Sequence, residues 1–161
     1  MKNQFGFVIG AVLYSGVASA TNPFALPTNT YTVNAGDSQI YVVVHKDTTT
    51  AASGLSHDHV MEAHGFTGEI SWNAGDASSC SLSVTVPVAE LVNDEPNMRR
   101  TAQLPDDLNE NNRRTVRENM LSEDQLDAEN HPTIGFQSTG CSHISGDQYN
   151  VTGNFTLLGN S

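Results

Sequence analysis

Three of the six histidines lie close together in the chain, at His57, His59 and His64. An H-x-H pair on a β-strand places both imidazoles on one face, about 6.6 Å apart along the strand, so the first two could bind one ion. His64 could add a ligand, and Asp58 or Glu62 could orient a ring. Such a set would suit Zn²⁺ or Cu²⁺. The alternative is that these histidines are exposed, or hydrogen-bonded near the rim of the fold.

The two cysteines, Cys80 and Cys141, each stand at the end of a strand pattern. If those strands pair in antiparallel fashion, both sulfur atoms lie at the same end of the pair. Exported proteins keep disulfides, so we expect a Cys80–Cys141 bond that contributes about 4 kcal/mol in the chain-entropy model. Two buried thiols are the alternative.

The sequence offers little for catalysis. Ser56 precedes His57, but neighbouring residues on a strand point to opposite faces. The chain has no G-x-S-x-G, P-loop, dinucleotide fingerprint or C-x-x-C motif. A metal-dependent hydrolase that uses His57, His59 and Glu62 is the one enzymatic alternative, and we predict that the protein is not an enzyme.

The first twenty residues are typical of a signal peptide. Lys2 precedes the uncharged apolar run 5–17, and an A-x-A cleavage site follows at 18–20. The run is too short to span a bilayer of about 30 Å as a helix. We therefore expect residues 1–20 to be removed and residues 21–161 to form one exported domain without stable membrane insertion. A retained N-terminal anchor is the alternative.

The charge balance argues against polyanionic partners. The chain has 18 Asp and Glu against 7 Lys and Arg, which gives a formal net charge of −11. Nucleic acids and anionic membrane surfaces both bind to cationic patches. Neither is therefore an expected partner.

Alternating apolar and polar residues predict a mainly β chain. In the stretch 80–88 the residues Cys80, Leu82, Val84, Val86 and Val88 face one way, and small polar residues face the other. One apolar and one polar face are what the wall of an antiparallel barrel requires. Further strand patterns occur at 31–33, 39–45, 66–72, 134–136 and 151–157.

Residues 93–130 differ in composition and predict a short helical excursion packed over one end of the β structure. Residues 110–121 are the expected helix, and Ser122 with Gln125 could cap a second, short one. Five arginines in this region could bind an acidic head group. We favour the simpler reading, an exposed helix face with local ion pairs.

From Tyr31 to Gly159, the order of motifs resembles the YceI-like family of periplasmic polyisoprenoid-binding proteins. The resemblance opens with Tyr31-Thr32-Val33 and the strand Ile40 to His45. The further motifs are Phe66-x-Gly68-x-Ile70, Val84-x-Val86-Pro87-Val88-x-x-Leu91, Arg117-x-x-x-Leu121-x-x-Asp124-x-Leu126-Asp127-Ala128, Pro132-x-Ile134-x-Phe136 and Val151-x-Gly153-x-Phe155-x-Leu157-x-Gly159. Two places depart from the family pattern: Gln125-Leu126 stands where an aromatic pair is usual, and Ser56-His57-Asp58-His59 precedes Phe66.

The resemblance implies a lipocalin-like β-barrel around an elongated apolar cavity. The implied function is a periplasmic carrier of a long-chain isoprenoid or similar lipid, such as one with a quinone-type tail, and no cofactor is required. The expected lining residues are Val42, Val44, Phe66, Ile70, Trp72, Leu82, Val84, Val86, Ile134, Phe136, Phe155 and Leu157. A packed core would use the same residues.

Two questions stay open at this stage. A periplasmic metal-binding protein that uses His57 and His59 is the alternative function, and a membrane cytochrome is a candidate partner. The last strand pattern, residues 154–158, has no following strand to pair with, and barrels avoid such open edges. In the resembled family more strands follow, so we expect the 21–161 domain to be truncated at its C-terminus. The alternative is a short form that closes by forming a homodimer.

Overall fold

The computed structural model of the chain describes residues 28–46, 49 and 57–161. The predicted signal peptide, residues 1–20, lies outside the described residues. The strands are β1 (Thr28–Thr32), β2 (Tyr41–Val44), β3 (His59–Ala63), β4 (Thr67–Asn73), β5 (Ser81–Pro87), β6 (Leu91–Asn93), β7 (Thr133–Ser145) and β8 (Gln148–Thr156). The helices are α1 (Pro96–Thr101) and α2 (Glu110–Leu121), with short 3-10 turns η2 (Ala77–Ser79) and η3 (Val88–Glu90).

All the strand pairs are antiparallel, which confirms the prediction of a mainly β fold with few helices. The strands form a five-stranded sheet in the order β1-β4-β5-β7-β8 and a three-stranded sheet in the order β2-β3-β6. Within the described part of the chain these strands do not join into a closed barrel.

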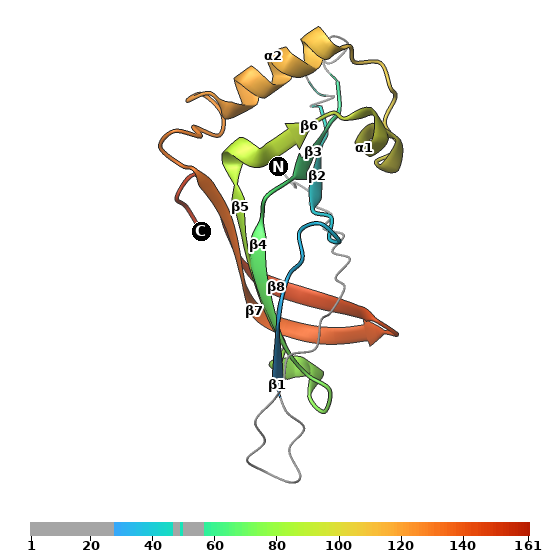
Figure 1. Ribbon diagram of the computed structural model, residues 1–161, viewed down its shortest axis with the longest axis vertical. Helices are drawn as coiled ribbons and strands as arrows, with labels where there is room; N and C mark the ends of the chain where they lie inside the picture. The colour runs from blue at the N-terminus through green and yellow to red at the C-terminus, as the bar shows by residue number, and fades with distance from the viewer. Residues whose placement is uncertain (1–27, 47–48, 50–56) are drawn as a thin grey trace.

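The smaller sheet continues the larger one (Figure 1). The chain passes from one sheet to the other three times, between β1 and β2, between β3 and β4, and between β5 and β6. β3 leads into β4 through Gly65, whose φ of 59° suits a residue without a Cβ. β5 leads into β6 through η3, and the His64 N–H donates to the Glu90 carbonyl at 3.1 Å, which ties the two breaks together. An irregularity of this kind interrupts the hydrogen-bond ladder locally and lets the strands bend.

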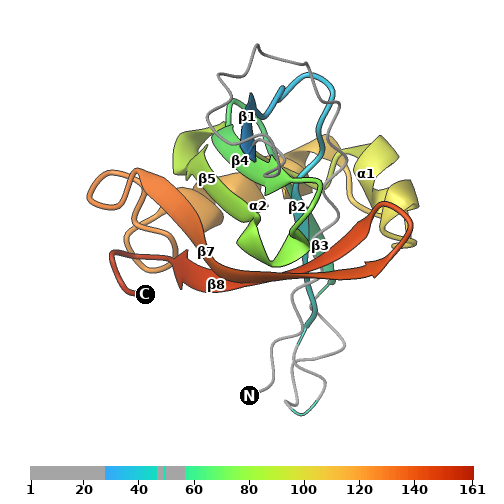
Figure 2. The same cartoon turned by 90° about the horizontal axis from the view of Figure 1, so that it is seen from below.

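The five-stranded sheet is curved, as the view from below shows (Figure 2). β4, β5, β7 and β8 follow one another round the curve, and α2 lies at the far end of the molecule (Figures 1 and 2). We call the face that carries Leu82, Val84 and Val86 the inner face, and the opposite face the outer face. The long β7–β8 hairpin extends beyond β5, because its register runs on to the pair Ser145–Gln148.

The predicted helical excursion is confirmed, and α2 occupies the predicted residues. The Asn109 side chain caps it by accepting a hydrogen bond from the Asn112 N–H at 2.9 Å. The second, short helix expected after Ser122 is wrong. That stretch forms turns, in which the Asp127 N–H donates to the Ser122 carbonyl at 2.8 Å. No described helix combines the length and apolar character needed to cross a bilayer.

Candidate functional site

The inner face of the five-stranded sheet is apolar across four strands. The register places Leu82 of β5 opposite Ile70 of β4, and Val84 of β5 opposite Phe136 of β7. Phe136 lies in turn opposite Phe155 of β8. Because alternate residues of a strand share a face, these side chains belong to one continuous apolar surface.

One end of the inner face is a packed core. Leu82, Val84 and Val86 are only 7–8 % exposed, and Met120 of α2 belongs to the same buried cluster. Burying a side chain of this size contributes about 1.5–3 kcal/mol, so this end of the face stabilises the fold. Further members or neighbours of this core are Val33, Ile40, Ala63, Phe66, Val88, Leu91, Ile70, Ile134 and Phe136.

Two aromatic side chains of the inner face, at different places on it, lie outside this core. Trp72 of β4 and Phe155 of β8 are half-buried, and neither is among the described residues that pack against the core. Phe155 lies opposite Phe136 on the edge strand, whereas Trp72 lies beyond Ile70, towards the disulfide. The predicted disulfide joins Cys80 to Cys141 with a Cα–Cα distance of 5.7 Å. It links the start of β5 to β7 beyond the last residue pair that those two strands form.

The remaining predicted lining residues lie at the margins of this face. Val42 belongs to the three-stranded sheet and lies opposite Met61, which packs against the core. Val44 is 47 % exposed at the end of β2. Leu157 follows β8 and is half-buried. The structure therefore brings most of the predicted residues onto one face, but not the two valines of β2.

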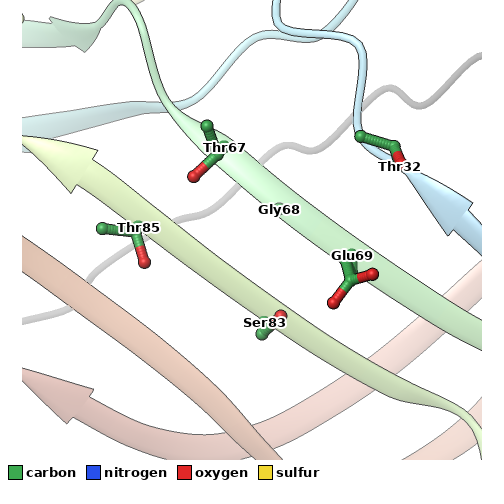
Figure 3. Close-up of a pocket in the computed structure, with 6 residues that line it drawn as sticks. All are labelled: Thr32, Thr67, Gly68, Glu69, Ser83 and Thr85. Carbon is green, nitrogen blue, oxygen red and sulfur yellow. The ribbon is translucent and has the colours of Figure 1, made fainter.

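A shallow hollow of about 280 Å³ lies on the outer face of the same sheet (Figure 3). It is lined by residues of three neighbouring strands: Thr32, Thr67, Gly68, Glu69, Ser83 and Thr85. Hydroxyl groups and one carboxylate would have to lose their water to contact a hydrocarbon chain, which is unfavourable. This hollow is therefore unsuited to a lipid tail.

The three clustered histidines do not converge. The Nδ1 atom of His57 lies 3.4 Å from Asp107, and the Nε2 atom of His64 lies 3.2 Å from Glu62. The Nδ1 atom of His59 lies 2.7 Å from Asp94. Among the described residues, no group of three or more His, Cys, Asp or Glu side chains is arranged to hold a metal ion.

A buried ion pair joins Asp94 to Arg99 where β3, β6 and α1 meet. The two side chains are 0 % and 1 % exposed, and the Arg99 Nη1 donates to the Asp94 Oδ1 at 2.7 Å. The remaining Arg99 nitrogens donate to the Pro105 carbonyl at 2.6 Å and to the Asp107 carboxylate at 2.9 Å. This arginine is thus buried, whereas we had expected it on an exposed helix face.

The pKa of Asp94 lies below its ordinary value. Burial acts to raise it, but hydrogen bonds from His59, from the Val60 N–H and from Arg99 together outweigh that effect. The carboxylate is thus held in its charged form. The pKa of Asp58 is also lowered, first by a hydrogen bond from the Lys46 N–H, and against a smaller opposing effect of burial.

Comparison with known proteins assigns the chain to a family. The family model described as the YceI-like domain matches residues 31–161, which is most of the chain. The protein belongs to the YceI-like family. The family is known for polyisoprenoid binding and its members are generally periplasmic, which supports a lipid-binding role at the level of the family. Neither a curated protein nor a solved structure gives a significant match to the chain.

The Asp94–Arg99 network escaped the sequence analysis. Asp94 and Arg99 stand in a charged, Pro-containing stretch that reads as an exposed loop. The one local signal is Pro96, which occupies the first position of α1 and is favoured there because its missing N–H is not needed. From Pro96 one could have predicted that Arg99 lies in a short helix, but not that its side chain is buried.

Proposed function

We propose that the protein is a periplasmic carrier of a long-chain isoprenoid or a similar lipid, such as one with a quinone-type tail. The observation that supports the proposal is the apolar inner face that runs from Ile70 to Phe155, on which Trp72 and Phe155 lie outside the packed core. Membership of the YceI-like family supports the same class of ligand.

The lipid would lie inside a lipocalin-like barrel of which the five-stranded sheet is one wall. Each buried CH₂ contributes about 0.8 kcal/mol. About ten such groups reach roughly 8 kcal/mol, which corresponds to a dissociation constant near 1 μM before the costs of ordering are included. Binding of this kind needs no catalytic group, so the proposed protein is a carrier and not an enzyme.

Delivery of the lipid fits an exported protein. The signal peptide predicted at residues 1–20 would bring the chain to the periplasm, where a membrane cytochrome that uses the lipid is a candidate partner. A homodimer is a second candidate assembly, because β8 lies at the edge of the five-stranded sheet and an edge strand can pair with another chain.

The direct test is to purify the protein from its native compartment, extract it with organic solvent and identify the lipid by mass spectrometry. We expect an isoprenoid lipid in a fixed ratio to protein. The same extraction after unfolding and refolding in lipid-free buffer should yield none. Recovery of no lipid from the native preparation would count against the carrier function.

Metal binding through His57 and His59 stays a prediction. The geometry does not favour it, because each ring is bound to a different carboxylate. Calorimetric titration with Zn²⁺ and Cu²⁺, repeated on the His57→Ala/His59→Ala double variant, decides the question. Loss of a one-to-one binding isotherm in the variant supports the site, and an unchanged isotherm rules it out.

A further inference from the structure

Trp72, the one tryptophan of the chain, holds a buried N–H group without a partner. Among the described residues, two side chains contain a buried polar atom with no hydrogen bond, and these atoms are Trp72 Nε1 and Ser38 Oγ. An indole N–H can only donate, and leaving such a group unpaired in an apolar site is unfavourable. Folded proteins seldom keep such a group, so this one requires an explanation.

The unpaired donor lies on the inner face. Alternation along β4 places Trp72 on the same face as Ile70, which packs against the core. Its neighbour Ser71 pairs with Ser81, the residue that follows the disulfide-bonded Cys80. Trp72 therefore lies on the inner face beside the disulfide, outside the core cluster, on the apolar surface along which the proposed lipid would bind.

Among the described residues, no lysine or arginine belongs to the sheet that carries Trp72. Of the described lysines and arginines, Lys46 follows β2, and all the arginines belong to α1 and α2. The strands β1, β4, β5, β7 and β8 contain neither residue type. A phosphate group placed near Trp72 would therefore lose its hydration without gaining a positive partner, which is unfavourable.

We propose that the Trp72 indole N–H donates a hydrogen bond to an uncharged oxygen at one end of the bound lipid, such as a prenol hydroxyl or a quinone carbonyl. This inference rests on the proposed carrier function and adds a specificity determinant to it. The hydrogen bond selects an oxygen-bearing isoprenoid over a hydrocarbon of the same length, while the apolar surface supplies most of the affinity.

The test compares two lipids on two proteins. Geranylgeraniol and the hydrocarbon of the same skeleton without the hydroxyl each compete with a fluorescent apolar probe, on the wild type and on Trp72→Phe. Phenylalanine keeps an aromatic ring and removes the N–H. We expect the wild type to prefer the alcohol by about threefold to tenfold, since a net hydrogen bond contributes roughly 0.5–1.5 kcal/mol. In Trp72→Phe that preference should vanish.

A matched control is Ser38→Ala, which removes the other unpartnered buried polar atom and should keep the preference. Equal affinity of the wild type for both lipids, or a preference that persists in Trp72→Phe, overturns the role of Trp72 and leaves the carrier function standing. Failure of both lipids to displace the probe from the wild type overturns the carrier function itself. Tighter binding of geranylgeranyl phosphate than of the alcohol overturns the uncharged head group.

A second measurement covers the case in which Trp72→Phe does not fold. Because Trp72 is the one tryptophan, the intrinsic emission of the wild type reports on this indole alone. We expect the complex with the alcohol to emit at longer wavelength than the complex with the hydrocarbon, since a hydrogen-bonded indole lies in a more polar environment. Identical emission from the two complexes contradicts the proposed hydrogen bond.

Discussion

Asp94 combines a left-handed backbone conformation with a fully buried side chain. Its φ of 54° is in the left-handed region, where few residues other than glycine are found. The backbone accepts this conformation because it directs the carboxylate inward, where the Val60 N–H, His59 and Arg99 all bind it. The ion pair thus connects α1 and the loop after it to β3 and β6 through hydrogen bonds.

Removing the carboxylate should therefore destabilise the fold strongly. In Asp94→Ala the guanidinium of Arg99 keeps its carbonyl partners and the partly exposed Asp107 carboxylate, but loses its buried carboxylate partner. We expect a loss of about 3–5 kcal/mol in the free energy of unfolding, which is typical when one member of a buried pair is removed. Urea unfolding at neutral pH measures it.

Glu118→Ala is the control for this change, because Glu118 lies 4.0 Å from Arg114 and both side chains are exposed. We expect that variant to stay within about 0.5 kcal/mol of the wild type. Equal unfolding midpoints for Asp94→Ala and Glu118→Ala would show that the buried pair does not stabilise the protein.

Acid should weaken the protein through the same carboxylate. The pKa of Asp94 in the folded state lies below its ordinary value, so between the two values the unfolded chain binds more protons than the folded one. The stabilisation is therefore complete above about pH 4 and is lost as the pH falls through the folded-state pKa. Urea midpoints between about pH 2 and pH 6 should show the gap between the wild type and Asp94→Asn narrowing in acid. A gap that stays constant over this range contradicts the assignment.

At the scale of elements, two glycines of the β7–β8 pair have different environments. A Cβ at Gly153 would lie 2.4 Å from the Gln137 carbonyl oxygen and 2.6 Å from the Phe136 ring. A Cβ at Gly135 would meet only Thr156 side-chain atoms, the nearest at 3.6 Å. The absence of a Cβ at Gly153 therefore leaves room for the Phe136 ring between β7 and β8. No such ring lies next to Gly135.

Gly153→Ala should consequently destabilise the hairpin, while Gly135→Ala should not. We expect a loss of about 1–3 kcal/mol for the first variant, because an added methyl group must displace backbone or Phe136. The second should change the free energy of unfolding by less than about 0.5 kcal/mol. Thermal unfolding of both variants, with the disulfide intact, measures the difference, and equal melting temperatures would contradict this account.

The elements themselves were largely predictable from local sequence. α2 has the predicted bounds because its cap at Asn109 and its helix-forming residues act within the element. β4, β5, β7 and β8 follow from alternation, which one buried face imposes. β6 was missed because a strand of three residues is too short to show alternation. The predicted second helix is wrong because the backbone around Asp127 forms turn hydrogen bonds in place of helical ones.

At the scale of the whole molecule, contacts between distant segments decide what the sequence could not. The Asp94–Arg99 pair is buried only because β3, β6 and the loop at Asp107 meet around it. Likewise, alternation predicts which residues share the inner face. Whether those residues fill a core or border a ligand depends on what packs against them, and here Trp72 and Phe155 lie outside the core cluster.

The two faces of the five-stranded sheet should therefore respond differently to the same new charge. Phe155 and Asn154 are neighbours on the edge strand β8, and they point to the inner and outer face respectively. Phe155→Asp places a carboxylate where the lipid is proposed to lie, whereas Asn154→Asp places one in solvent. A lipid that binds only the folded state raises its stability, by about 2.7 kcal/mol at a hundredfold excess over the dissociation constant.

We expect geranylgeraniol to raise the melting temperature of the wild type and of Asn154→Asp by similar amounts, and to leave that of Phe155→Asp nearly unchanged. Circular dichroism without lipid first checks that all three proteins are folded. An equal rise in all three would mean that the prenol binds elsewhere. If the lipid raised the melting temperature of Phe155→Asp but not that of Asn154→Asp, the binding site would lie on the outer face. The two residues are adjacent and project from opposite sides of one strand, so contact with the ligand is what distinguishes them.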